Sequence, residues 1–306
     1  MDNILTLISS TSFLFSIIRV STPLTFAALA SLVTKKAGIT NIAVEGIMLI
    51  AALTGVLVSS GTESALLGLI GAIISGIIIS LILGFFAIKL EADMYLAGIA
   101  ANIMAVGGTV FVLFMASGDK GVSTSLPSKV LPTIELPIIK NIPFLGEILS
   151  GHNILTYVSF LAVIVVYLLL NRTATGLRIR SVGENPKSAE SVGVSVDKIK
   201  IISLVLSGIL ASVGGAYLSM GYVSWFARGI TAGRGYIGMS AMNLGNATPI
   251  GSFLGSLLFG FAEALSMSMQ SLKIPVEFVQ MMPYLITILG LVFFSIIRDR
   301  KEKNNK

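Results

Sequence analysis

The segment ALLGLIGAIISGIIISLILGFFAI, residues 65–88, decides the fold class. It contains no charged residue, and at about 1.5 Å per helical residue it is long enough to cross a hydrocarbon core of about 30 Å. Similar runs recur along the chain, which is 54% hydrophobic and 12% charged, whereas soluble domains are about 25% charged. The sequence therefore predicts an all-α polytopic membrane protein, with one transmembrane domain over residues 1–306.

The apolar runs predict about nine spans, and a count of eight to ten is compatible with the pattern. The expected spans are 4–33, 42–60, 65–88, 94–116, 153–171, 199–220, 235–248, 250–269 and 279–297. Arg19 and Pro23 interrupt the first run, so residues 4–18 could instead form a separate interfacial piece. The run 235–248 reaches only about 21 Å as a helix, which is too short to cross alone.

Lysine and arginine residues between the spans predict the orientation, because basic residues favour the cytoplasmic side. With the C-terminus in the cytoplasm, fourteen of them fall on the cytoplasmic side and six on the opposite side, Arg19 being unassigned. The six are Lys120, Lys129, Lys140, Arg228, Arg234 and Lys273. The N-terminus is then expected outside.

Composition also excludes several kinds of function. The chain has no cysteine and a single histidine, His152, which is too few ligands for a metal site or a catalytic triad. The net charge of +6 comes from residues between apolar runs and indicates topology rather than nucleic-acid binding. The chain lacks the G-x-x-x-x-G-K-[ST] phosphate loop. We therefore expect no catalytic residue, no metal and no enzyme activity.

Two connections between spans are long. Residues 117–152, expected outside, carry four prolines among mixed charges, which favours an extended, turn-rich loop over a helix. Residues 172–198, expected in the cytoplasm, contain a short helix signal: Asn185 as N-cap, Pro186 in the first helical position and Gly193 as terminator.

The stretch GENPKSAESVGV, residues 183–194, resembles the cytoplasmic loop of permeases in ATP-binding-cassette (ABC) importers. Their consensus, Glu-Ala-Ala, three residues and Gly, is matched here by Lys187, Ser188, Ala189 and Gly193, so the Glu and the first Ala are replaced. The resemblance implies a coupling helix that contacts an ATPase subunit. Its expected contact residues are Gly183, Asn185, Pro186, Ala189, Glu190 and Gly193. The alternative is an ordinary solvated loop that is helical.

Five longer segments, in the same order along the chain, resemble the branched-chain amino acid and ribose type permease superfamily, and most of all its nucleoside permeases that work with basic-membrane-lipoprotein receptors. These segments are residues 37–50, 92–107, 176–194, 206–221 and 233–265. The resemblance implies the membrane-spanning permease subunit of an importer in the bacterial cytoplasmic membrane, carrying a nucleoside or similar small polar solute.

The same resemblance implies the partners: an ABC ATPase subunit, a second homologous permease subunit and an extracytoplasmic substrate-binding lipoprotein. ATP and magnesium would bind the ATPase, so no cofactor is expected in this chain. The alternative function is an ion-coupled secondary transporter, in which Glu45 and Glu263 would be the coupling carboxylates.

Two segments rich in glycine and polar residues, 38–46 and 235–251, interrupt apolar runs in comparable places of the two halves. Paired interruptions are typical of broken helices around a solute pathway, and they suggest a two-half pseudo-repeat. The expected pathway residues are Asn41, Glu45, Asn102, Tyr236, Asn243 and Asn246. The alternative for the glycines is close helix packing.

Several of these residues have a second interpretation. Glu45 could line the pathway or form an ion pair with Lys35 or Lys36, and Glu263 could fix helix packing. Three aromatic residues could stack a nucleobase at the outer entrance or belong to the aromatic belt of the membrane interface. They are Tyr222, Trp225 and Phe226.

Overall fold

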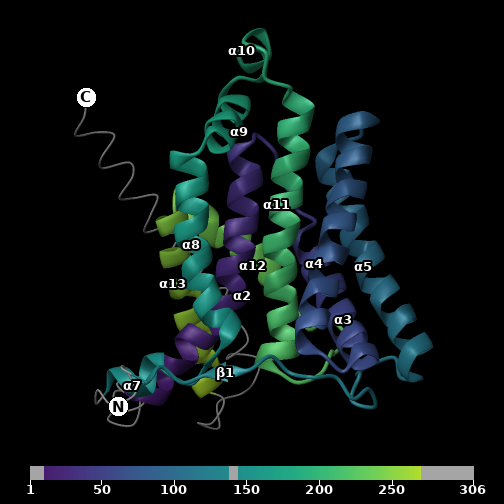
Figure 1. Cartoon of the computed structure of the whole chain (residues 1–306), viewed down its shortest axis with the longest axis vertical. Helices are drawn as coiled ribbons and strands as arrows, with labels where there is room; N and C mark the ends of the chain where they lie inside the picture. The colour runs from purple at the N-terminus through teal and green to yellow at the C-terminus, as the bar shows by residue number, and fades with distance from the viewer. Residues whose placement is uncertain (1–9, 138–143, 270–306) are drawn as a thin grey trace.

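The computed structural model describes residues 10–137 and 144–269, and these are mostly helical (Figure 1). The first half contains α2 (Thr11–Lys36), α3 (Val44–Thr62), α4 (Ala65–Gly84) with the π-helical turn η1 (Phe85–Lys89), and α5 (Met94–Ser117). A loop region follows with β1 (Thr133–Ile134), α7 (Leu145–Leu149) and β2 (His152–Asn153). The second half contains α8 (Ile154–Arg172), α9 (Ala174–Glu184), α10 (Pro186–Ser191), α11 (Val196–Tyr217) with the π-helical turn η2 (Leu218–Tyr222), α12 (Arg234–Leu244) and α13 (Pro249–Met269).

Seven of the described helices are long and apolar enough to cross a membrane, so the chain is a multi-pass membrane protein. The expected span at 235–248 is the 11-residue α12, which reaches only about 16 Å, in agreement with the prediction that it cannot cross alone. The expected span at 279–297 lies outside the described residues. The predicted total of nine and the pseudo-repeat remain predictions.

For its described part, residues 11–18, the alternative that 4–18 form a separate piece is wrong, because α2 is one continuous helix from Thr11 through Arg19 and Pro23. Proline has no N–H to donate to the carbonyl four residues earlier. Here the hydroxyl of Tyr217 on α11 donates to that carbonyl, the Arg19 oxygen, at 3.0 Å. The Arg19 guanidinium lies 4.5 Å from the Tyr222 ring centre and donates to the Tyr222 carbonyl at 2.6 Å. Tyr217 of α11 thus binds the carbonyl that Pro23 leaves free, and Tyr222 of η2 binds the Arg19 guanidinium. Neither residue interrupts α2.

Two helices, α2 and α11, form the centre of the bundle, with α8 and α13 on one side and α3, α4 and α5 on the other (Figure 1). Large apolar side chains of the outer helices face away from the protein. Among them are Leu66, Ile74, Ile103, Phe111, Met115, Leu161 and Ile164. Exposure of so much apolar surface to water is unfavourable, so these faces are suited to contact with lipid or with another membrane subunit.

One end of the bundle carries α9 and α10 and is called the α10 end; the other carries β1 and α7 and is called the β1 end (Figure 1). At the β1 end, residues 118–136 form no helix and contain turns, as predicted, and they bond to η2 and to the segment that follows it. Ser123 N donates to Phe226 O at 2.9 Å, and Leu131 N to Met220 O at 2.8 Å. The prediction of no helix in 117–152 is wrong for α7, a single five-residue turn.

At the α10 end, the predicted short helix is confirmed. Asn185 caps α10 by accepting from Ser188 N at 3.1 Å, Pro186 is its first residue, and Gly193 ends the turn with φ +83°. α9 was not predicted, although Thr173 is a suitable N-cap; the helix buries Gly176, Ile179 and Val182.

Candidate functional site

Two helices begin inside the bundle rather than at its ends, and α3 is the first. After α2, residues 37–43 turn back into the protein, and Asn41 Nδ2 donates to Ser207 Oγ at 3.2 Å. Ser207 is about 16 Å along α11 from Val196. Asn41 Oδ1 accepts from Ala43 N at 3.0 Å, at the entry to α3.

α12 is the second such helix, and its N-terminus meets the first turn of α3 at Glu45. One oxygen, Oε1, accepts from Gly233 N at 2.8 Å, and the other, Oε2, accepts from Gly235 N at 2.7 Å. The two backbones are so close that a Cβ on Gly235 would lie 2.7 Å from Glu45 Cα, so only glycine fits there. The alternative ion pair of Glu45 with Lys35 or Lys36 is wrong, since no such pair forms among the described residues and the carboxylate binds the α12 terminus instead.

Asn102 on α5 links these two helix starts. Its Oδ1 accepts from Gly46 N at 2.8 Å, and its Nδ2 donates to Ile42 O at 3.0 Å and to the Tyr236 hydroxyl at 2.8 Å. The Asn102 side chain is buried. One amide therefore satisfies an unpaired N–H at the start of α3 and orients a residue of α12.

These groups line a cavity of about 620 Å³ between α3, α5 and the segment leading into α12. Three predicted pathway residues, Glu45, Asn102 and Tyr236, are brought together in its wall. Four residues of the wall, Gly229, Thr231, Ala232 and Gly233, were not predicted; their sequence signal was the pair of glycines, both of which have positive φ. A volume of this size suits a small solute, and the wall combines apolar surface with a few polar groups.

An ion pair supports the N-terminus of α12 from the opposite side. The Arg234 guanidinium binds the Glu263 carboxylate of α13, and both side chains are largely buried. Arg234 Nη1 also donates to the carbonyls of Ile230 and Thr231, at 3.2 and 3.4 Å. This geometry matches the interpretation of Glu263 as a partner that fixes helix packing.

The other predicted pathway residues lie elsewhere. Asn41 and Asn243 line a separate space of about 40 Å³, next to Ser31 and Lys35. Asn246 is exposed in the turn between α12 and α13, with φ +54°. The sequence could not separate these asparagines from Asn102, because their positions depend on how far each interrupted segment enters the bundle.

The three predicted entrance aromatics do not form one stacking surface. Phe226 is 0% exposed and belongs to the buried core, so its assignment to the entrance is wrong. Tyr222 is held by Arg19. Trp225 alone of the three is exposed.

At the α10 end, the predicted contact residues divide into outward and inward groups. Ala189 is 3% exposed and packs in the apolar cluster with Val182 and Ile199, so the prediction that it offers a docking face is wrong for this conformation. Val192, by contrast, is 78% exposed. Gly183 packs against the end of α2, where a Cβ would lie 2.1 Å from Lys36 O. Asn185, Pro186, Glu190 and Gly193 are exposed.

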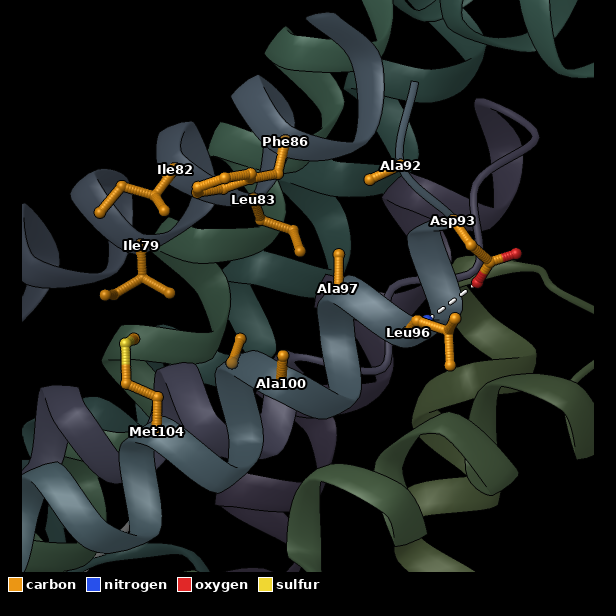
Figure 2. A pocket seen from close by; sticks show the side chains of 11 residues that line it. Ile79, Ile82, Leu83, Phe86, Ala92, Asp93, Leu96, Ala97, Ala100 and Met104 are labelled. Atoms are coloured by element: carbon orange, nitrogen blue, oxygen red, sulfur yellow. Dashed lines mark hydrogen bonds between the residues drawn. The ribbon is translucent and has the colours of Figure 1, made fainter. Parts of the chain in front are cut away.

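A second large cavity, about 580 Å³, lies between α4 with η1 and α5 (Figure 2). Figure 2 shows apolar side chains on both walls, with Ile79, Leu83 and Phe86 on one side and Met104 on the other. The one carboxylate there, Asp93, caps α5 by accepting from Leu96 N at 2.9 Å. This cavity lacks the polar groups that a hydrophilic solute needs.

A bundle of membrane-spanning helices with a polar cavity at two inward helix starts defines a multi-pass solute permease. The chain belongs to the family described as the permease component of the branched-chain amino acid transport system, whose profile matches residues 13–291.

The individual relatives are also described as permease proteins. The chain is 33% identical to the guanosine ABC transporter permease protein NupQ of Bacillus subtilis, over 92% of this chain and 91% of NupQ. It is 35% identical to the nucleoside ABC transporter permease protein NupC of Lactococcus lactis, over 90% of this chain and 89% of NupC. A putative glucose ABC transporter permease protein of Haloferax volcanii is 30% identical, over 85% of this chain and 78% of that protein. No solved structure matches the chain.

Proposed function

We propose that the chain is the membrane-spanning permease subunit of an ABC importer and that it carries a nucleoside or similar small polar solute through the cavity at Glu45, Asn102 and Tyr236. The observation that carries the proposal is this cavity, in which polar groups of three helices converge inside an apolar bundle. Two relatives named for guanosine and nucleoside transport support the choice of solute over a sugar.

The energy source belongs to a separate ATPase subunit, which binds ATP and magnesium, and this chain has no cofactor or enzyme activity of its own. The α10 end is the docking site for the ATPase. Its exposed face there is formed by Lys187, Glu190 and Val192, which lie on or beside the helix that Asn185 caps.

A second homologous permease subunit completes the pathway. The wall of the cavity on the α5 side includes Ile103 and Val106, which are 68% and 53% exposed. An open wall in an apolar surface would admit lipid to a polar site, so a neighbouring subunit is needed to close it. The β1 end, with the exposed Lys129 and Arg228, receives a substrate-binding lipoprotein.

This arrangement requires the α10 end to be cytoplasmic and the β1 end to face outward in a bacterial cytoplasmic membrane. Because the chain has no cysteine, single cysteines at Ser125 and Ser191, both exposed, can be labelled in intact cells. An impermeant thiol reagent should label Ser125→Cys only. Labelling of both positions from outside would contradict the orientation.

Co-purification tests the assembly. The chain, tagged and extracted from its native membrane, should bring with it an ATPase and a second permease, and the complex should hydrolyse ATP while the chain alone does not. If the chain purifies without any ATPase and the purified chain moves solute on an ion gradient, it is a secondary transporter.

A further inference from the structure

The N-terminus of α12 is a place where an anion would normally bind. The first N–H groups of a helix have no partner within the helix, and the aligned peptide dipoles place partial positive charge there. In this chain the place is already filled, because the Glu45 carboxylate accepts from Gly233 N and Gly235 N at 2.8 and 2.7 Å.

Two further groups near the cavity that could bind an anion are also paired within the chain. Gly46 N, at the start of α3, donates to Asn102 Oδ1. The Arg234 guanidinium is bound to Glu263 and to two main-chain carbonyls. Among the described residues, Glu45 is the one charged side chain that lines the cavity, and the neighbouring Arg234 and Glu263 neutralise each other, so the wall carries a negative charge supplied by Glu45.

We propose that Glu45 is a charge filter that determines the specificity of this site: it admits neutral and cationic solutes and rejects anionic ones. The inference rests on the proposed function and narrows its substrate class to unphosphorylated nucleosides. A phosphate or carboxylate on the solute would face the like charge of Glu45, and the two α12 donors that would otherwise bind it, Gly233 N and Gly235 N, are already taken by Glu45.

Three ligands that differ only at the 5′ carbon separate charge from size: guanosine (neutral), 5′-amino-5′-deoxyguanosine (cationic) and guanosine 5′-carboxylate (anionic). They compete with tritiated guanosine for the purified permease–ATPase complex in nanodiscs, without the receptor, so that the selectivity measured is that of the membrane site. On the wild-type complex, guanosine and the amine should displace the label, and the carboxylate should fail at about 100-fold excess.

Two variants test the residue itself. Glu45→Gln removes the charge, keeps the size and leaves one N–H of α12 without an acceptor, so the carboxylate ligand should now compete within about tenfold of guanosine. Glu45→Asp keeps the charge and should still reject it.

The filter is overturned if the wild-type complex binds the carboxylate ligand as well as guanosine, or if Glu45→Gln binds guanosine and rejects the carboxylate as the wild type does. The wild-type comparison decides the matter even if Glu45→Gln does not fold. Failure of the wild-type complex to bind guanosine at all would instead overturn the proposed function, and the filter with it.

Discussion

The hydroxyl of Tyr217 donates a hydrogen bond of 3.0 Å to the main-chain oxygen of Arg19, the carbonyl that Pro23 leaves without a donor in α2. Tyr217 is 1% exposed, so water cannot replace it. The bond therefore allows α2 to continue past a proline in the centre of the bundle.

Tyr217→Phe should lower the free energy of unfolding by about 1–3 kcal/mol, because it leaves a buried carbonyl unsatisfied. The measurement is the Tm in detergent. Tyr167→Phe, on the exposed face of α8, is the matched control and should change Tm much less. Equal Tm values for the two variants would show that Pro23 is tolerated without Tyr217.

Asn102→Leu should lower nucleoside uptake by about tenfold or more, since the loss of one good polar contact, about 1.4 kcal/mol, already gives that factor. Leucine cannot bind Gly46 N, Ile42 O or the Tyr236 hydroxyl. The control is Asn171→Leu, whose amide is exposed and bonds only within α8 among the described contacts. Uptake at the wild-type rate by Asn102→Leu would remove this residue from the site.

Val192→Asp should leave the Tm unchanged and release the ATPase, because the side chain is exposed beside α10. Co-purification and uptake are the measurements, and Lys198→Ala is the control, expected to retain both. Retention of the ATPase by Val192→Asp would exclude this face as the docking surface.

Ala189→Arg tests the stability of the α10 end: it should lower the Tm, since this side chain lies within the protein's own core.

The burial of His152, at the β1 end, predicts that the stability of the protein depends on pH. Its ring stacks on Phe15 with centroids 3.9 Å apart and bonds to Ile148 O at 2.8 Å, and burial lowers the pKa of His152 below its usual value. The folded protein therefore favours the neutral ring, and the stabilisation is complete above about pH 6.5 and decreases as the pH falls towards the lowered pKa. The Tm should fall below about pH 6.5, and less so in His152→Phe; identical pH profiles would contradict this.

Local signals were predictable from the sequence, and distant pairings were not. The α10 helix was predicted because its start signals, Asn185 and Pro186, and its stop signal, Gly193, are close together in the sequence. The direction of Ala189 was not, because it depends on α9 and α11 packing beneath it. Pro23 suggested a break because the carbonyl it leaves free, Arg19 O, is bound by Tyr217, which lies 198 residues from Arg19 in the chain.

The candidate site shows the same division. Glu45, Asn102 and Tyr236 were selected as polar groups within apolar runs, and the structure brings them together. The capping of α12 by Glu45 could not be foreseen, because it joins residues 188 and 190 positions apart. Phe226 was misplaced because an aromatic near a span end is consistent with either a core or an interface position.

Under the proposed function, this chain moves a nucleoside only as part of an ATP-driven assembly. The most direct measurement is uptake of tritiated guanosine into proteoliposomes that hold the co-purified permease–ATPase complex and the receptor. Uptake should require hydrolysable ATP on the side of the α10 end and should persist when ion gradients are dissipated. Uptake by the permease alone, driven by an ion gradient and indifferent to ATP, would contradict the account.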